Sequence, residues 1–360
     1  MSVRRLDRRT LNRATLHRQW LAVRRDAPVA AALTHLVGLQ AQEPHEPYTG
    51  LWSRLAGFAP AELVTQLEER RAVRALMMRR TLHLLTAADC AGMRPLFQTM
   101  LVQKVRGTLG RRLVGVDLDE LAAAGRPLFH EGPRTPVDVA RELAGRWPGA
   151  PVRDLGDALS TVVPLVQVPP RGLWGRTGPG ATTTLEAWLG AASAPELDVA
   201  EVVRRYLRAY GPAARADVRV WSGLTGLPAV VERLRPELVT YRDERGRELL
   251  DLAGEEMPDP DLPVPPRFLP AFDNAVLGYD DRSRIIDDEH RLLSVAGARY
   301  VLIDGRVAAT WTSSAGDGEV TVAVAPLRPF SRAERDEVAA EGERLAAFLG
   351  DGTPGRVSFS

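Results

Sequence analysis

Cysteine and lysine are almost absent from this sequence. Among its 360 residues, Cys90 is the single cysteine and Lys104 is the single lysine, although lysine and arginine together number 47. One cysteine excludes an internal disulfide framework and is typical of a reducing compartment. The positive charge is therefore almost entirely guanidinium, which favours bidentate contacts with phosphate and carboxylate groups. A GC-rich genome produces the same enrichment by codon bias, so composition alone does not choose between the two explanations.

Long apolar segments and familiar catalytic motifs are missing as well. No apolar run approaches the roughly 18 residues that a membrane-spanning helix needs, and the arginine-rich start lacks the apolar core of a secretory signal. We therefore expect a cytoplasmic protein without a membrane-bound part. The six histidines show no metal-ligand spacing. Neither a phosphate-binding glycine loop, a dinucleotide-binding fingerprint nor a G-x-S-x-G motif occurs, so we expect neither a metal nor an organic cofactor.

Three stretches of the chain show helices followed by short strands, which is the outline of a winged helix. The third is the clearest, with helices expected at 199–210, 215–224 and 228–234 and strands at 238–241 and 248–252. Similar units in tandem indicate an internal repeat, although the residues differ between the copies. The acidic, proline-rich stretch GEEMPDPDLPVPPR follows as an extended linker. Beyond it, apolar and polar residues alternate as they do in strands.

The predicted fold class is α+β, with three tandem winged-helix units and a β-rich C-terminal part. In the first unit, residues 72–86 are expected to form two short strands around Met78 to Arg80. Ser331 and Glu334 form a capping box at the start of a closing helix that we expect to end at Leu349. The chain is thus divided into a first unit at 1–92, a helical segment with a second unit at 93–190, a third unit at 191–254, a linker at 255–267 and the C-terminal part at 268–360.

The stretch GLQAQEPHEPYTGLW holds an unusual pair of glutamines. Gln40 and Gln42 stand two residues apart at the end of an apolar run, and Pro44 follows closely. Side chains two apart share one face of an extended segment, but not of an α-helix. If Pro44 has drawn the chain out of helical conformation by Gln42, the two amides converge on one point. The alternative, which the pattern alone favours, is a helix C-terminus with two solvated amides.

Seven runs, in order along nearly the whole chain, resemble the bacterial AlkZ-type family of winged-helix DNA glycosylases. They are LNRATLHRQWL, HLVGLQAQEP, YTGLWSRL, RTLHLLTAAD, AYGPAARADVRVWSGL, LPAFDN and IDGRVAATW. The most specific is the Gln-x-Gln pair inside GLQAQ. The resemblance implies a C-shaped molecule that hydrolyses the N-glycosidic bond of N7-alkylguanine and unhooks interstrand crosslinks. It implies that Gln40 and Gln42 are the catalytic residues.

The resemblance also implies a β-hairpin at 306–324 that holds DNA. Its tip carries Asp317 and Glu319 but no cation, so Arg306 and Trp311 would have to make the contact instead. The implied partner is double-stranded DNA with alkylated or crosslinked guanine, bound by a monomer mainly through phosphate contacts that weaken steeply with salt. The candidate DNA-binding residues are Arg79, Arg80, His83, Arg282, Arg284, Arg306 and Trp311.

Each of these DNA contacts has a structural alternative. The arginines are at least as often found in surface or interdomain ion pairs, His83 would more commonly be a strand histidine held by its neighbours, and Trp311 would more commonly be half-buried in its sheet. The alternative function is a winged-helix protein that binds DNA without chemistry. The third unit's recognition helix, PAVVERLRPE, has no Asn, Gln or Lys to read base edges, which counts against a sequence-specific regulator.

Leaving-group chemistry explains why two neutral amides would suffice. Alkylation at N7 places a positive charge on guanine, so the base departs as a neutral molecule with little acid assistance. The remaining tasks are to position water and to stabilise a positively charged sugar, which an amide oxygen can do. Strand cleavage through a Schiff base needs an amine, and Lys104 is the single lysine, so we expect a monofunctional enzyme. The residues do not choose between general repair and protection of a producer from its own alkylating antibiotic.

Overall fold

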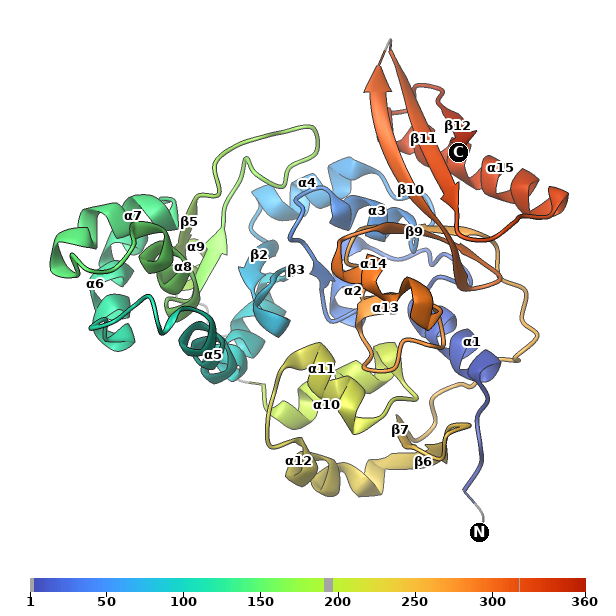
Figure 1. The fold of residues 1–360 in the computed structure, drawn as a ribbon, viewed down its shortest axis with the longest axis horizontal. Coiled ribbons are helices and arrows are strands. Elements are labelled where there is room, and N and C mark those ends of the chain that lie inside the picture. The colour runs from blue at the N-terminus through green and yellow to red at the C-terminus, as the bar shows by residue number, and fades with distance from the viewer. Residues whose placement is uncertain (1–2, 191–196, 317) are drawn as a thin grey trace.

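The computed structural model of the chain describes residues 3–190, 197–316 and 318–360. Within these ranges the fold is α+β, as predicted, with two five-stranded sheets and one two-stranded sheet surrounded by helices. Helix α7 (Pro136–Leu143) and helix α15 (Arg332–Leu349) lie near opposite ends of the long axis (Figure 1). No helix in the described ranges is both long enough and apolar enough to cross a bilayer.

The first sheet joins the first two units of the chain. Its strands follow the order β1, β3, β2, β4 and β5, and every pair is antiparallel. The hairpin of β2 and β3 is the one expected within residues 72–86. Strand β2 pairs directly with β4, with Arg74 opposite Gln167, so the two units share one sheet. The strands span Leu39–Gln40 (β1), Ala72–Leu76 (β2), Leu82–Thr86 (β3), Leu165–Gln167 (β4) and Thr182–Thr184 (β5).

Helices cover this sheet and extend away from its β5 edge. Three short helices pack around the strands of the first unit, where their apolar side chains form one buried cluster with Leu39 and Leu84. The second unit has its own cluster around Leu159 and Phe129. The helices are α2 (Val29–His35), α3 (Glu46–Trp52), α4 (Pro60–Glu68), α5 (Ala87–Leu109), α6 (Leu118–Glu131), α7, α8 (Val152–Val162) and α9 (Leu185–Leu189).

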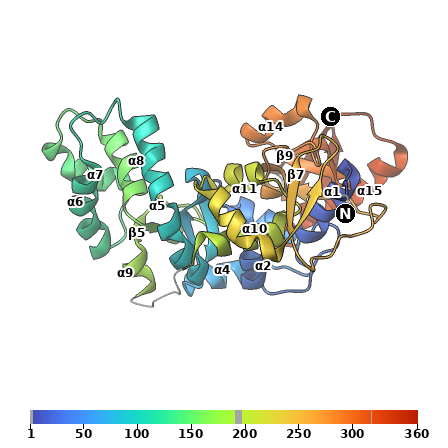
Figure 2. The same ribbon diagram turned by 90° about the horizontal axis from the view of Figure 1, so that it is seen from below.

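The third unit matches its expected elements to within two residues at each end. Helix α10 buries Tyr206 and Tyr210 against Trp221 of α11, and these rings join the core cluster that lies beneath the β2–β3 hairpin. Figure 2 shows α10 and α11 in the middle of the molecule, between α5 and β7. The elements are α10 (Val199–Tyr210), α11 (Arg215–Ser222), α12 (Leu227–Leu234), β6 (Leu238–Arg242) and β7 (Glu248–Leu252).

The C-terminal part is a second five-stranded sheet with α15 packed on it. As predicted, Ser331 and Glu334 form a capping box at the start of this helix, which ends at Leu349. Strands β10 and β11 form the long hairpin that projects from the molecule (Figure 1); Asp317, at its tip, lies outside the described residues. The elements, in sheet order, are β12 (Arg356–Phe359), β11 (Glu319–Pro326), β10 (Arg306–Gly316), β9 (Arg299–Ile303) and β8 (Arg267–Leu269), with α13 (Asn274–Leu277) and α14 (Arg291–Val295) between β8 and β9.

Helix α1 (Arg8–Arg18) connects the third unit with the C-terminal part. The guanidinium of Arg18 donates to both carboxylate oxygens of Asp251 on β7, at 2.6 and 2.8 Å. Asn12 donates from Nδ2 to the backbone oxygen of Gly305, at 2.8 Å, in the turn between β9 and β10. The Arg18–Asp251 pair is almost fully buried, so the N-terminal helix is fixed to the third unit as well as to the C-terminal part.

Candidate active site

Gln40 ends strand β1 and Gln42 lies in the bend that follows it, so neither is at the end of a helix. Helix α2 ends at His35, and Gly38 turns the chain into β1 with a φ of +85°. A Cβ at Gly38 would lie 2.9 Å from the backbone oxygen of Leu84, so only glycine fits this turn. Gln40 lies opposite His83 on β3. The ladder continues where Ala41 N donates to Leu82 O at 2.8 Å, which makes the helix C-terminus alternative wrong.

Both glutamine side chains reach the same turn, the one between β2 and β3. The Oε1 atom of Gln40 accepts a hydrogen bond from Nη2 of Arg79 at 2.7 Å. The Oε1 atom of Gln42 accepts a longer one from the backbone N–H of Leu82, at 3.4 Å. Gln40 is 8% exposed, whereas Gln42 is exposed. Both amides are therefore held from the region of the β2–β3 turn, that of Gln42 at the protein surface and that of Gln40 just beneath it.

A buried arginine fixes the backbone between the two glutamines. Arg74 on β2 donates from Nη2 to the backbone oxygen of Ala41 at 2.8 Å, and from Nη1 to the side-chain oxygen of Gln167 on β4. Burial, together with the nearby charge of Arg171, lowers the pKa of Arg74 to about 10. The guanidinium therefore stays charged at neutral pH. Through it, strands of the first and second units hold the Gln-x-Gln backbone in place.

Arg79 brings three parts of the chain together at Gln40. Besides Gln40, its guanidinium donates to the backbone oxygen of Trp221 on α11 at 3.1 Å and to Oδ1 of Asn274 on α13 at 2.9 Å. All three acceptors are neutral, and burial lowers the pKa of Arg79 to about 10. The backbone is left-handed at Arg79 and at Arg80, with φ of +56° and +63°. Two successive non-glycine residues seldom adopt this conformation without strong local restraint.

His83 lies inside the protein beside this cluster and is fully buried. Its Nδ1 meets the backbone oxygen of Thr81 at 3.0 Å. Because a carbonyl oxygen only accepts, Nδ1 carries the proton, and Nε2 is left as an acceptor with no partner among the residues that the structure describes. Burial, and then the charge of Arg79, lowers the pKa of His83 to about 3. The predicted DNA contact by His83 is therefore wrong, since a buried, neutral ring offers DNA neither surface nor charge.

Comparison with known proteins identifies the family of this chain. The sequence model of the family described as "DNA glycosylase AlkZ-like" matches residues 33–348, which is most of the chain. The chain belongs to the AlkZ-like DNA glycosylase family. Its fold is similar to that of the Streptomyces sahachiroi DNA glycosylase AlkZ, with a TM-score of 0.77 and 20% sequence identity over 99% of this chain and 100% of that chain. No curated protein matches the sequence.

Two other predicted DNA contacts of the glycosylase are wrong, because their side chains lie in the interior. Arg284 is 3% exposed, donates to the backbone oxygen of Pro212 at 2.9 Å, and stacks over the ring of Tyr279 at 4.2 Å. Trp311 is 2% exposed, and its ring N–H donates to the backbone oxygen of Leu269 at 2.9 Å. Neither side chain has surface to present to a duplex.

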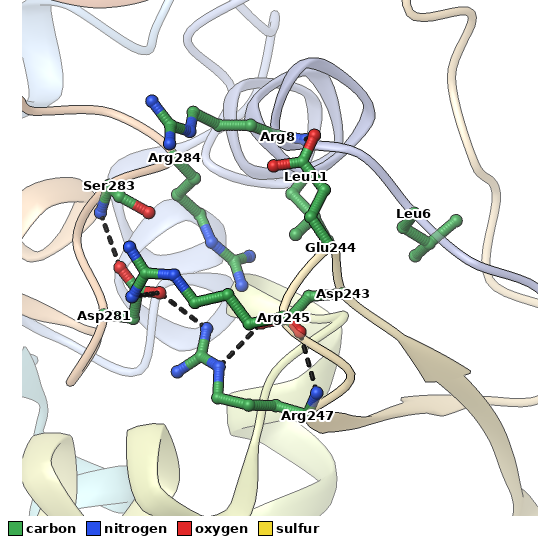
Figure 3. Close-up of a pocket in the computed structure, with 10 residues that line it drawn as sticks. All are labelled: Leu6, Arg8, Leu11, Asp243, Glu244, Arg245, Arg247, Asp281, Ser283 and Arg284. Carbon is green, nitrogen blue, oxygen red and sulfur yellow. Dashed lines mark hydrogen bonds and ion pairs between the residues drawn. The ribbon is translucent and has the colours of Figure 1, made fainter.

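The surroundings of Arg284 form a small pocket of about 30 Å³ (Figure 3). Arg247 bridges Asp243 and Asp281 there with ion pairs of 2.6 and 2.7 Å. These pairs join the β6–β7 turn to the segment before Arg284. The pocket is therefore a structural junction between the third unit and the C-terminal part.

The remaining predicted DNA contacts keep some exposed surface but are engaged within the protein. Arg80 forms an ion pair with Asp157 on α8 at 2.7 Å, as the ion-pair alternative expects. Arg282 donates to Ser294 at 2.6 Å, and burial lowers its pKa. Arg306 pairs with Asp287 at the base of the long hairpin. A phosphate would have to displace or share these partners.

Sequence reasoning missed two residues of this site, Arg74 and Asn274. Both had a signal. Arg74 interrupts the otherwise apolar strand AVRAL, and a charged residue at the centre of a buried strand needs a specific partner. Asn274 ends the run LPAFDN, which carries part of the family resemblance, and lies at the first position of α13. It is 3% exposed, and its Nδ2 has no hydrogen-bond partner in the described part of the chain.

Proposed function

We propose that this DNA glycosylase hydrolyses the N-glycosidic bond of cationic N7-alkylguanine, in monoadducts and in interstrand crosslinks, with Gln40 and Gln42 as its catalytic residues. The observation that supports the proposal is that both amides are held from the β2–β3 region, Gln40 by Arg79 and Gln42 by the backbone of Leu82. One of them is exposed to an approaching duplex. Pairing with β3 on one side and the buried Arg74 hold the backbone between them, which is the preorganisation that positioning catalysis needs.

The proposed step is a simple hydrolysis. A water oxygen forms a bond to C1′ of the sugar while the C1′–N9 bond breaks. The electron pair of the broken C1′–N9 bond stays on N9 and neutralises the positive charge of the alkylated base. One water proton is released to solvent. The amides orient the water and direct a dipole at the sugar while it carries positive charge. They supply no general acid, so a neutral base should remain attached.

The open position of Gln42 suits a crosslinked substrate. Many glycosylases extrude the target base into a deep pocket, but a crosslinked guanine is tied to the opposite strand and cannot leave freely. A catalytic amide at the surface can reach the sugar without full extrusion. We therefore propose that the enzyme approaches the lesion within the duplex, and that Arg80, Arg282 and Arg306 contribute phosphate contacts.

We propose that the enzyme leaves an abasic site without cleaving the strand. Strand cleavage by a glycosylase requires an amine that attacks C1′. The single lysine, Lys104, is exposed on α5, whose neighbouring apolar residues pack into the core of the second unit. Gln40 and Gln42 lie at the opposite edge of the shared sheet, on and after β1. Borohydride treatment during turnover should therefore trap little or no covalent protein–DNA adduct.

The proposal is tested by incubating the purified enzyme with a duplex that holds one 7-methylguanine, and then heating the product in alkali to cleave abasic sites. Wild type should give cleavage at the lesion. Gln40→Ala and Gln42→Ala should bind the duplex normally but lose activity. Gln103→Ala, which removes an exposed amide from α5, is the matched control and should act as wild type does. The proposal fails if wild type releases neither 7-methylguanine nor a crosslinked guanine, or if both glutamine variants stay fully active.

A further inference from the structure

The contact between Arg79 and Gln40 fixes which end of the Gln40 amide faces the protein. A guanidinium carries five N–H donors and no acceptor. The amide atom that lies 2.7 Å from Nη2 of Arg79 must therefore be the oxygen. The Nε2 atom of Gln40 points the other way. It has no hydrogen-bond partner among the described residues and is not one of the buried polar atoms sealed from solvent.

Arg79 is itself held rigidly, so the orientation that it imposes is well defined. Its two terminal nitrogens donate to three acceptors from three different elements. Its left-handed backbone is unfavourable and is maintained by these contacts. Two neighbours carry buried polar atoms that have no partner within the described ranges, Nδ2 of Asn274 and Nε2 of His83. Unsatisfied buried groups are uncommon in folded proteins, and their gathering around one arginine indicates a functional constraint rather than simple packing.

We infer that Arg79 is a positioning residue that gives the two glutamines opposite roles, Gln40 as hydrogen-bond donor and Gln42 as acceptor. The inference rests on the proposed function and deepens it. A water molecule held this way accepts from Nε2 of Gln40 with one lone pair and donates a proton to Oε1 of Gln42. Its second lone pair is left to attack C1′. The nearby cation also polarises the Gln40 amide and strengthens its N–H donor.

This role replaces the DNA contact that the sequence suggested for Arg79. The donors on its terminal nitrogens already serve three protein acceptors, and the side chain is half-buried. A phosphate would find only the two N–H donors that these acceptors leave, on a half-buried side chain. Gln42, by contrast, is exposed, and the bond from Leu82 N–H to its oxygen is long, at 3.4 Å. A second lone pair on that oxygen remains available for water.

Two matched substitutions separate the roles. Glutamate has the shape of glutamine but only accepts hydrogen bonds when ionised. Under single-turnover conditions with the 7-methylguanine duplex, Gln42→Glu should stay within about tenfold of wild type because the acceptor is kept. Gln40→Glu should lose about 100-fold or more, the effect of removing one preorganised donor, even though its carboxylate can pair with Arg79. Equal losses, or the reverse order, would overturn the inference.

Variants of Arg79 distinguish positioning from phosphate binding. Arg79→Met should lower the single-turnover rate, and Arg79→Lys should restore part of it because a lysine keeps the charge and a donor. The dissociation constant for undamaged duplex and its salt dependence should not change. A phosphate contact would instead reduce the slope of log K against log salt by about 0.9. A reduced salt slope for duplex binding by Arg79→Met, together with an unchanged single-turnover rate, would overturn the inference. If Arg79→Met does not fold, the two glutamate variants still decide.

A wild-type enzyme that is inactive on every N7-alkylguanine substrate would remove both the proposed function and the division of roles. An active wild type with the wrong order of glutamate variants would remove only the division of roles. The two failures are therefore distinguishable in one set of rate measurements.

Discussion

Replacing Asp273 by asparagine removes one charge from a buried ion pair that joins the first unit to the C-terminal part. The side chains of Arg54 and Asp273 are 0% and 1% exposed. Arg54 donates to both carboxylate oxygens, at 2.8 and 2.9 Å. Asp273 also caps α13 by accepting from the backbone N–H of Ala275 at 2.8 Å. Asparagine keeps the cap through its oxygen, but its NH2 group replaces the oxygen that accepts from Nη1 of Arg54. The substitution therefore removes the charge together with one hydrogen bond.

Asp273→Asn should lower the free energy of unfolding by about 3–5 kcal/mol, because the substitution leaves the buried Arg54 guanidinium without a counter-charge. At about 2–4 °C per kcal/mol for a large domain, the melting temperature should fall by about 6–20 °C. The same change in the more exposed Arg80–Asp157 pair, Asp157→Asn, should cost less than about 1 kcal/mol. The double variant Arg54→Met with Asp273→Asn removes both charges and should recover much of the loss.

Thermal unfolding followed by tryptophan fluorescence measures all four proteins under identical conditions. The reasoning is refuted if Asp273→Asn melts within about 2 °C of wild type, which corresponds to less than about 1 kcal/mol. It is refuted equally if the double variant is less stable than Asp273→Asn, because a buried uncompensated charge would then not be the cause.

Three further predictions concern single residues around the site. Burial lowers the pKa of His83 to about 3, so between about pH 6.5 and 3 the unfolded chain binds a proton that the folded protein excludes. The free energy of unfolding should therefore fall as pH decreases from about 6.5 toward 3. Melting curves of His83→Asn should show a shallower decline of stability with pH, and a decline identical to that of wild type would contradict this. Burial raises the pKa of Cys90 to about 12, so a thiol reagent should label it only after unfolding, and rapid labelling of native protein would exclude the buried thiol. A Cβ at Gly172 would lie 2.9 Å from Nη1 of Arg74, so Gly172→Ala should reduce single-turnover glycosylase activity by up to about 100-fold, whereas Gly175→Ala, with a positive φ but nothing within 4 Å of its Cβ, should not.

Local sequence patterns predicted the elements whose boundaries are set by nearby residues. The third unit and the closing helix are examples, since helix α15 begins at a capping box that is readable in four residues. Helix α5 was less visible. It spans 23 residues with apolar side chains around its circumference, because it contacts the cores of both the first and second units. A helix buried on several sides has no single apolar stripe to recognise.

The shared sheet was also beyond sequence reasoning. The pairing of β2 with β4 joins residues more than 90 positions apart, such as Arg74 and Gln167. Nothing in a single sequence specifies such a long-range register. For the same reason the glutamine pair was predicted but its supports were not. Gln40 and Gln42 are only two residues apart in the chain, whereas Asn274 reaches Arg79 from a different part of the fold.

Three of the predicted DNA contacts were wrong because the residues are buried. Arg284, His83 and Trp311 were chosen by residue type, but charge and aromaticity serve the interior as well as the surface. Arg284 satisfies backbone oxygens inside the protein, and Trp311 bonds to Leu269 across the sheet. Whether such a residue serves the interior or contacts DNA depends on its burial, and burial depends on the whole fold.

The most direct test of the account compares a cationic and a neutral lesion in the same duplex. Single-turnover release of 7-methylguanine and of hypoxanthine is measured for wild type, Gln40→Ala and Gln42→Ala, with duplex binding measured in parallel. Paired amides without a general acid should release 7-methylguanine and leave hypoxanthine in place, and each variant should bind but not react. Comparable release of hypoxanthine, or retention of full activity by the variants, would contradict the central claim.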